Sequence, residues 1–279
     1  MSSSQIDDIL ARQPKAAFRA QVGEAEVRSF RERGFTSVAR ITTDEEIAWL
    51  REVYDWLFAD KSRALKGLHF DLARPYESEG EDRLPQIIAP EQVVPALKTT
   101  AFWRNGRHVA SLCMGVDEEH LHGWGHMIRK AARIGAPLPW HQDEAYWDPG
   151  MIYRAMGSWL ALDDATLENG CMSFIPGSHG SDVLAHRHVN DDPAVHALFT
   201  EPDPADIARA VAVPVRAGGA VFHHSRTLHG SGPNTTDKPR RAWANEWQLA
   251  PAKAATVRDA PWMDEHRKAW AARSVLQEN

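Results

Sequence analysis

The part of the chain after residue 126 consists of short extended runs separated by turns, and this pattern limits the possible folds most strongly. Turn chemistry is supplied by Asn169-Gly170, Pro176-Gly177 and Gly218-Gly219. Many short strands joined by such turns predict a β-barrel or a jelly roll of two sheets. The runs with strand character are GSWLALDD (157–164), GCMSFIPGSH (170–179), VAVPVRAGGAVFHH (211–224) and RAWANEWQLA (241–250).

The N-terminal part of the chain predicts helices that flank these strands. Residues 24–33 have the pattern of a short helix that ends at Gly34, and an extended stretch, FTSVARI, follows. Thr43 and Glu46 then have the spacing of a capping box, in which each side chain caps the backbone of the other residue. Residues 47–57 carry an apolar stripe at helical spacing, so we expect this second helix to pack against a sheet. The sequence therefore predicts a mainly β fold with flanking helices.

Two segments lack a clear helix or strand pattern. Residues 1–22 are mixed in character and predict a loose arm. Residues 61–95 are charged and punctuated by prolines, which predicts a loop or a lid over a binding site. The whole chain has 279 residues, 43% hydrophobic and 25% charged, which is ordinary for a globular protein. We expect a single domain over residues 1–279.

Charge and composition argue against several classes of partner. The formal net charge is −6 and no basic stripe is present, so we expect no nucleic-acid partner. No stretch approaches the roughly 20 apolar residues that a membrane-spanning helix needs, so we expect no membrane partner. Cys113 and Cys171 form no CxxC motif, the N-terminus lacks a secretion signal and the C-terminus lacks a peroxisomal tripeptide. These features predict a cytoplasmic protein and leave its oligomeric state open.

The segment WHQDEAYW (140–147) contains a histidine and an aspartate two residues apart. In an extended strand alternate side chains project to the same face, so His141 and Asp143 would point together while Gln142 points away. A third metal ligand must come from a distant strand, and His229, at the end of an extended run, is the candidate. Two imidazoles and one carboxylate on one side of an ion leave three positions open, as in the facial triad of non-haem Fe(II) oxygenases.

Three blocks of the sequence resemble the phytanoyl-CoA dioxygenase (PhyH) family of Fe(II)- and 2-oxoglutarate-dependent oxygenases. They are HQD (141–143), LDDATLENGCMSFIPGSH (162–179) and HGSGPNTTDKPRR (229–241), and the likeness extends to FRERGFTSVARITTDEEIAWLR (30–51). The blocks occur in the family's order and cover most of the chain. The resemblance implies a double-stranded β-helix, which is a cupin-like jelly-roll core with flanking helices, and the strand pattern is compatible with it.

The resemblance also implies roles for individual residues. The histidines and the aspartate of the predicted triad match the family's iron ligands. Arg240, eleven residues after His229, matches the arginine that binds the distal carboxylate of 2-oxoglutarate, for which a planar guanidinium is well suited. Ser231 matches a hydroxyl residue that assists there, and Trp159 matches an aromatic residue that packs beside the cosubstrate.

The implied reaction uses Fe(II), 2-oxoglutarate and O2, releases succinate and CO2, and hydroxylates an unactivated C–H bond of a small-molecule substrate. Related halogenases replace the carboxylate ligand by a small residue, whereas this chain retains Asp143. Desaturation, ring closure and epimerisation stay open. Tyr146, Trp147, Trp124 and Trp243 are the candidates for substrate contacts, and their aromatic rings indicate an apolar or ring-bearing substrate without identifying it.

Other polar residues near these blocks have simpler interpretations. His223 and His224 lie at a strand end, where polar side chains often turn toward solvent, so we do not expect them to bind iron. The run HLHGWGH (120–126) lacks the further ligands of a zinc site and is expected to line or support the pocket. Lys130 would add positive charge near the cosubstrate, but a solvated lysine is the simpler interpretation.

An alternative from another functional class uses the same fold. A jelly-roll metal protein could lack the oxygenase cycle and serve as a small-ligand binding module, or as a zinc- or manganese-dependent lyase or isomerase. Asp143 and Arg240 favour the oxygenase, because a protein without the cosubstrate would have no use for the arginine.

Overall fold

Two antiparallel sheets form the centre of the computed structural model, which describes residues 3–15, 17–76 and 78–275. The larger sheet contains β1 (Phe35–Val38), β2 (His69–Asp71), β3 (Pro85–Ile88), β4 (His122–Lys130), β7 (Ala155–Ala161), β12 (Ala220–His224) and β14 (Arg240–Gln248). Its strand order is β1-β12-β7-β14-β4-β3-β2. The smaller sheet, in the order β11-β8-β13-β5, contains β5 (Leu138–His141), β8 (Met172–Phe174), β11 (Val211–Val213) and β13 (His229–Ser231).

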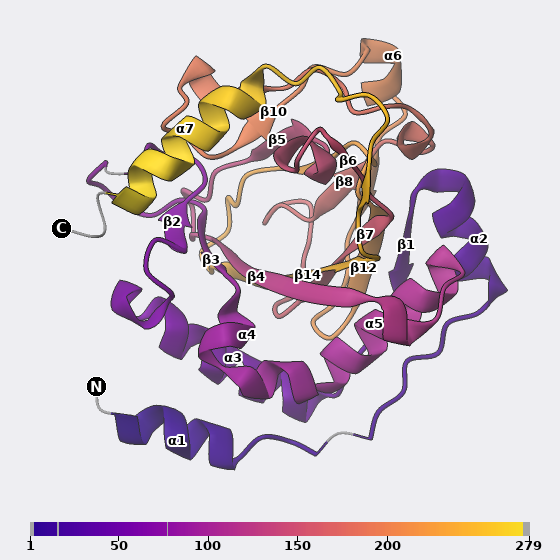
Figure 1. The fold of residues 1–279 in the computed structure, drawn as a ribbon. Helices are drawn as coiled ribbons and strands as arrows, with labels where there is room; N and C mark the ends of the chain where they lie inside the picture. The colour runs from indigo at the N-terminus through magenta and orange to yellow at the C-terminus, as the bar shows by residue number, and fades with distance from the viewer. Residues whose placement is uncertain (1–2, 16, 77, 276–279) are drawn as a thin grey trace.

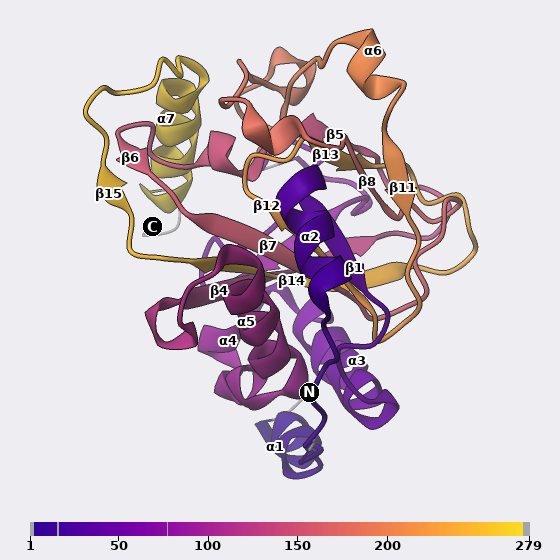
Figure 2. The same cartoon turned by 90° about the vertical axis from the view of Figure 1, so that its right-hand side faces the viewer.

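Short elements and helices surround these sheets. The short strand pairs are β6 (Met151–Ile152) with β15 (Ala252–Lys253), and β9 (Arg187–His188) with β10 (Leu198–Phe199). The helices are α1 (Ser3–Ala11), α2 (Glu24–Arg33), α3 (Asp44–Phe58), α4 (Pro90–Val93), α5 (Ala101–Met114), α6 (Pro204–Ile207) and α7 (Trp262–Val275). Helices α3, α4 and α5 lie on one side of the larger sheet and the smaller sheet lies on the other (Figures 1 and 2). The predicted mainly β fold with flanking helices and a jelly-roll core is confirmed.

Strand β14 shows how the larger sheet separates two apolar interiors. Trp243 and Trp247 are fully buried on the helix side, where Trp243 packs edge-on against Phe102 of α5, with ring centroids 5.0 Å apart. Ala242 and Ala244 point to the other side and join the apolar cluster between the two sheets. Because successive strand residues alternate in direction, the tryptophans anchor the helices while the alanines leave room for the interior of the jelly roll.

The start of α3 differs from the predicted capping box in one half. The Thr43 hydroxyl accepts a hydrogen bond from the Glu46 backbone N–H at 3.2 Å, as predicted. The Glu46 carboxylate does not return to Thr43. It accepts hydrogen bonds from the backbone N–H groups of Ala101 and Phe102 at 2.7 and 2.9 Å, and so caps the first turn of α5. A buried helix N-terminus elsewhere in the fold attracts this carboxylate more strongly than its own helix does.

The two segments without a clear sequence pattern are more ordered than predicted. The expectation of a loose arm is wrong for residues 3–11, which form α1: Ile9 is buried, and its carbonyl accepts a 2.8 Å hydrogen bond from the Trp49 indole of α3. The expectation of a loop is wrong for parts of residues 61–95, because β2 and β3 extend the larger sheet at one edge. Apolar contacts with distant residues, which local patterning does not show, order both segments.

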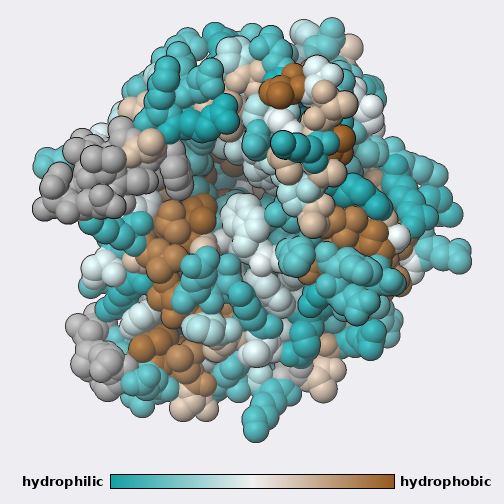
Figure 3. All heavy atoms as spheres, in the orientation of Figure 1, coloured by the Kyte–Doolittle hydropathy of each residue, from teal (hydrophilic) through white to brown (hydrophobic). Residues whose placement is uncertain are grey.

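The outer surface is predominantly polar on the face shown in Figure 3, where hydrophobic side chains form separate patches among hydrophilic ones. Exposed large hydrophobic side chains such as Leu167 and Val257 are far apart in the sequence. Within the described ranges, no helix combines the length and the apolar character needed to cross a lipid bilayer.

Candidate functional site

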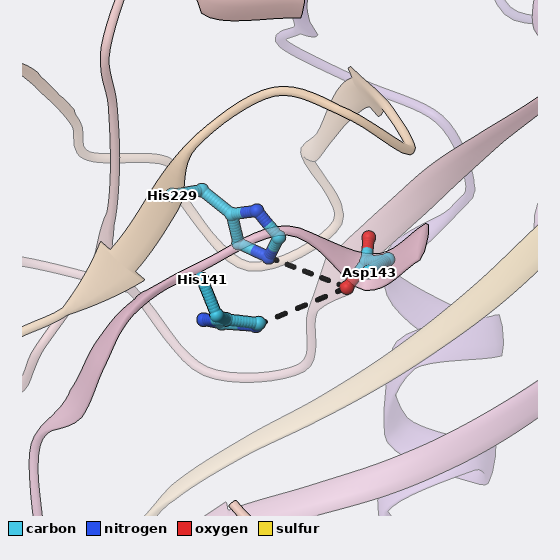
Figure 4. A group of neighbouring side chains, drawn as sticks. All are labelled: His141, Asp143 and His229. Carbon is cyan, nitrogen blue, oxygen red and sulfur yellow. Dashed lines mark ion pairs between the residues drawn. The ribbon is translucent and has the colours of Figure 1, made fainter. Parts of the chain in front are cut away.

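Three side chains that the sequence predicts as a metal triad converge at one edge of the smaller sheet. His141 ends β5 and His229 begins β13, and these two residues are direct partners in the antiparallel pairing of the strands. The Nε2 atoms of His141 and His229 lie 3.8 and 3.5 Å from the same oxygen, Oδ1 of Asp143 (Figure 4). One potential ligand atom from each residue lies within 4.8 Å of the others. An ion bonded at about 2.1 Å to nitrogen and oxygen ligands fits a group of this size.

Hydrogen bonds to the backbone orient both imidazoles. Nδ1 of His141 donates to the Pro139 carbonyl at 2.8 Å, and Nδ1 of His229 donates to the Thr227 carbonyl at 2.9 Å. These bonds select the tautomer in which Nε2 carries the free lone pair, which is the form that binds a metal. Burial lowers the pKa of both histidines, so the rings stay neutral and available as ligands.

The carboxylate of the triad is held by a residue whose position was predicted wrongly. His223 does not turn toward solvent: it is buried, and its Nε2 donates to Oδ2 of Asp143 at 2.9 Å. Burial alone would raise the pKa of Asp143, but His229 and the hydrogen bond from His223 hold that pKa below its usual range. Asp143 is therefore ionised, and its Oδ1 remains directed at the two imidazoles. Strand alternation could have indicated this, since His223 shares a face with the buried Val221.

The turn that carries Asp143 is fixed by residues that point away from the triad. The strand ends at His141, and Asp143 begins a single turn of 3-10 helix (Asp143–Tyr146), so the prediction that both ligands lie on one strand is wrong. Glu144 in this turn is fully buried and pairs with Arg226, whose Nε and Nη2 lie 2.9 Å from its two carboxylate oxygens. Arg258 adds a third contact at 3.1 Å. A bidentate ion pair to a fully buried carboxylate restricts the turn to one conformation.

Two cationic side chains lie side by side in the interior of the jelly roll. Arg240 and Lys130 are register partners on β14 and β4, and both are essentially inaccessible to solvent. The Nη1 atom of Arg240 donates to the Gly170 carbonyl at 2.5 Å and Nζ of Lys130 donates to the Ala136 carbonyl at 2.5 Å. Neither forms an ion pair with a carboxylate in the part of the chain that the structure describes. The expectation of a solvated Lys130 is wrong.

Burial of these two cationic side chains costs electrostatic free energy, and a bound anionic ligand would offset that cost. Burial lowers the pKa of Arg240 to about 10, and burial followed by the charge of Arg240 lowers the pKa of Lys130 well below its usual value. The Nε atom of Arg240 is buried without a hydrogen-bond partner among the described residues. Buried charges are normally paired, so this pair of cations is suited to bind a carboxylate.

Of the two residues that the sequence predicts beside the cosubstrate, Trp159 contacts Arg240 and Ser231 lies on the strand that begins with His229. The Trp159 ring on β7 is buried, and the guanidinium carbon of Arg240 lies 4.8 Å from its centroid. Ser231 is buried on β13, two residues after His229 and therefore on the same face of the strand. Stacking on Trp159 orients the guanidinium plane, which favours bidentate binding of a carboxylate.

A cavity of about 460 Å³ opens beside the triad and includes His141 and Asp143 in its wall. Three of the four residues predicted to contact substrate, namely Trp124, Tyr146 and Trp147, line it, and His126 of the run 120–126 lines it as well. Residues 61–95, which were predicted to form a loop or a lid, contribute Leu72, Gln86 and Ile88 to the wall. Helix α7 contributes Met263, His266, Arg267 and Ala271. The cavity thus lies between the triad and aromatic side chains, where a small molecule would be held close to a bound metal.

The PhyH family model, described as phytanoyl-CoA dioxygenase (PhyH), matches residues 30–242, which is most of the chain. The chain belongs to the PhyH family. The crystal structure of EvdO2 from Micromonospora carbonacea var. aurantiaca, complexed with 2-oxoglutarate, is 39% identical, with a TM-score of 0.76 over 88% of this chain and 99% of EvdO2.

Two curated relatives match a shorter part of this PhyH-family chain. Phytanoyl-CoA dioxygenase domain-containing protein 1 of Rattus norvegicus is 38% identical over 118 residues, which is 42% of this chain and 40% of that protein. The probable alpha-ketoglutarate-dependent hypophosphite dioxygenase of Stutzerimonas stutzeri is 35% identical over 123 residues, 41% of this chain and 43% of that protein. The matches thus span about two fifths of the length of these curated relatives.

The prediction that Trp243 contacts the substrate is wrong for this PhyH-family chain. Trp243 is fully buried on the helix side of β14, away from the cavity, and packs against α5. Arg240 and Trp243 are three positions apart on one strand, so strand alternation places them on opposite faces. Glu246, which the sequence analysis missed, occupies the cavity side instead. Burial, followed by the nearby charge of Asp143, raises its pKa well above the usual range.

Acid is expected to destabilise the fold through His186, which supports the residue between the two ligands of the HQD motif. The Gln142 backbone N–H donates to Nε2 of His186 at 3.1 Å, and Nδ1 of His186 donates to the Leu184 carbonyl at 2.8 Å, so the ring must be neutral. Burial lowers its pKa to about 4, whereas the unfolded chain binds the proton near pH 6.5. The free energy of unfolding should therefore fall as the pH decreases from about 6.5 to about 4, by at most about 3 kcal/mol from this residue.

Urea unfolding at pH 7.5 and pH 5 measures this effect in the wild type and in His186→Gln. Glutamine can still accept the hydrogen bond from Gln142 but does not titrate, so the variant should lose less stability between the two pH values. An equal loss in both proteins would assign the acid sensitivity to other groups, such as His224, whose pKa burial also lowers to about 4.

Proposed function

We propose that this chain is a non-haem Fe(II)- and 2-oxoglutarate-dependent dioxygenase that hydroxylates an unactivated C–H bond of a small molecule. The observation that carries the proposal is the convergence of His141, Asp143 and His229 beside a cavity, with their ligand atoms within 4.8 Å of one another. Two neutral imidazoles and one ionised carboxylate are the donor set of facial-triad iron sites. Family membership and the likeness to EvdO2, which was crystallised with 2-oxoglutarate, support the same assignment.

The interior charges fit the proposed cosubstrate. 2-Oxoglutarate carries two carboxylates. Arg240 and Lys130 are buried and form no ion pair among the described residues, so they are suited to the carboxylate distant from the metal. Trp159 holds the plane of the guanidinium, and Ser231 offers a hydroxyl on the same strand as His229. Lys130 is thus an addition to the cosubstrate residues that the sequence predicts.

Each group of side chains has a distinct task in the proposed reaction. When bound, Fe(II) and 2-oxoglutarate supply the O2-dependent oxidation of a C–H bond, with release of succinate and CO2. The carbonyls of Pro139 and Thr227 hold the imidazoles with Nε2 toward the metal, and His223 holds Asp143. Trp124 and Trp147 bind the substrate in the cavity and exclude water from it. These contacts position the substrate and leave the choice between hydroxylation and another oxidative outcome to the substrate geometry.

Anaerobic addition of Fe(II) and 2-oxoglutarate tests the proposal. Bidentate binding of the keto acid to protein-bound Fe(II) should give a visible charge-transfer band that neither addition gives alone. Zinc binding without such a band would instead support a jelly-roll metal protein that lacks the oxygenase cycle. Succinate release across a panel of metabolites, with and without O2, then identifies the class of substrate.

A further inference from the structure

Glu246 is a buried acid in the cavity wall to which the proposed chemistry assigns no task. It lies on β14 between its register partners Trp124 on β4 and Gly157 on β7, and only 6% of its surface is exposed. Its Oε2 atom has no hydrogen-bond partner among the described residues. The cationic side chain that shares the cavity wall, Arg267, pairs with Asp264 at 3.1 Å. Burying a carboxyl oxygen without a hydrogen-bond partner costs free energy. Its presence here indicates a ligand that supplies the missing hydrogen bond.

The neighbouring strand is shaped to admit this carboxyl next to the triad. A Cβ atom on Gly157 would lie 2.6 Å from Cε1 of His223 and 3.2 Å from Oε1 of Glu246. A side chain at position 157 would therefore collide with the histidine that holds Asp143 and crowd the glutamate. Glycine leaves space for both side chains on the inner face of the sheet. Glu246 is consequently one side chain away from the triad, in the region where the reacting part of a substrate would lie.

The rest of the cavity limits what kind of molecule could reach this carboxyl. Its wall is largely apolar and aromatic, with Trp124, Ile128, Leu138, Trp147 and Met263 among the lining residues. Such a wall binds a carbon skeleton through apolar contact, and the polar groups among the lining residues fix the orientation of the ligand. A ligand that places a donor group on Glu246 would hold its neighbouring carbon atoms toward His141 and Asp143.

We propose that Glu246 is a substrate-binding residue and that the substrate presents a hydroxyl or amino group to it from an apolar or ring-bearing skeleton. This inference rests on the proposed function, whose substrate class it narrows. The hydrogen bond selects which carbon faces the metal, because the donor group and the skeleton are held at two different points. Glu246 acts by binding and orientation and takes no part in the oxidation itself.

Matched probes test the proposal without knowledge of the natural substrate. Benzyl alcohol, benzylamine and toluene have similar skeletons and differ in the donor group, and their dissociation constants can be measured by calorimetry on the full chain. For each polar probe, the dissociation constant of toluene is divided by that of the probe. This ratio is compared between wild type and Glu246→Leu, because the cost of desolvating each probe is the same in both proteins and cancels. We expect the ratio for at least one polar probe to fall about tenfold or more in the variant.

Glu246→Gln separates the two donor classes. The amide still accepts a hydrogen bond but cannot ionise. An alcohol preference should therefore largely persist, whereas a preference for an amine, whose ammonium group would pair with the ionised carboxylate, should be lost. Glu91→Leu is the matched control, because Glu91 is also buried with an unpartnered Oε2 but does not line the cavity, and it should leave the ratios unchanged. Equal ratios in wild type and Glu246→Leu, or no binding of any probe, would overturn the inference.

The titrations are run on metal-free protein and again anaerobically with Fe(II) and 2-oxoglutarate. The charge-transfer band reports the proposed function, whereas the ratios report Glu246. A protein that shows the band but no dependence of the ratios on Glu246 would refute the substrate-binding role alone. A Glu246-dependent ratio without the band would refute the oxygenase assignment and leave a binding site for the same class of molecule.

Discussion

Replacing His229 by alanine is expected to abolish 2-oxoglutarate turnover, lowering succinate formation by more than about a hundredfold. Loss of an outer partner of a metal ligand typically costs 10- to 100-fold, and loss of a ligand itself should exceed that range. The variant should also lose Fe(II), since the remaining pair, His141 and Asp143, provides only two protein ligands. Metal analysis after gel filtration and succinate measurement check both effects. Retention of one equivalent of iron and of turnover would remove His229 from the proposed triad.

Controls separate the loss of a ligand from a loss of folding. His229→Gln preserves more of the side-chain volume at this buried position, and its thermal transition shows whether the strand remains intact. His122→Ala removes an exposed histidine that does not line the cavity, and it should leave iron binding and turnover unchanged. A similar loss of turnover in His122→Ala would indicate a general effect of histidine removal.

Arg240→Met is expected to weaken 2-oxoglutarate binding about 30-fold or more while leaving the ligand-free protein at least as stable as the wild type. Removal of one partner of a buried, hydrogen-bonded charge pair costs about 2–5 kcal/mol of binding free energy. Without the cosubstrate, however, the guanidinium is a buried charge that lacks a carboxylate partner in the described structure, so an apolar replacement should not reduce stability. Calorimetric titration of 2-oxoglutarate and urea unfolding of the ligand-free protein measure the two effects.

Arg241 is the matched control for this experiment because it is adjacent in sequence and faces the opposite side of β14. Its guanidinium forms two contacts of 2.8 and 2.9 Å with Asp163 and one of 2.8 Å with Asp55. Arg241→Met should therefore destabilise the protein by about 1–3 kcal/mol and leave the affinity for 2-oxoglutarate unchanged. The opposite pattern, with stability lost in Arg240→Met and affinity lost in Arg241→Met, would reverse the assignment of the two arginines.

Local sequence rules predicted the part of the site that depends on neighbouring residues. The two-residue spacing correctly predicted that His141 and Asp143 share one site, although Asp143 lies in a 3-10 turn after the strand. Strand alternation also implies that only one of Arg240 and Arg241 faces inward. The same rule, applied consistently, excludes Trp243 from the site, because an odd number of positions separates it from Arg240. That prediction also relied on strand alternation, but it did not compare the position of Trp243 with that of the inward-facing Arg240.

Residues that depend on pairing between distant strands could not be located from one sequence. The burial of Lys130 follows from its register with Arg240 across β4 and β14, and no local pattern predicts that register. Strand alternation indicates that His223 is buried, but its contact with Asp143 also requires β12 to lie inside the larger sheet, between β1 and β7. The helix α1 and the strands β2 and β3 were likewise missed, since their order comes from tertiary contacts that outweigh weak local patterns.

Because His141 and His229 are direct partners in the pairing of β5 with β13, metal binding depends on the formation of this strand pair. These two residues come together only when β5 and β13, which are far apart in the sequence, form an antiparallel pair. Contacts between residues distant in sequence form slowly during refolding. The metal site would therefore form only when β5 and β13 pair. Because Fe(II) would bind the folded protein and not the unfolded chain, free Fe(II) would shift the folding equilibrium toward the folded protein by mass action.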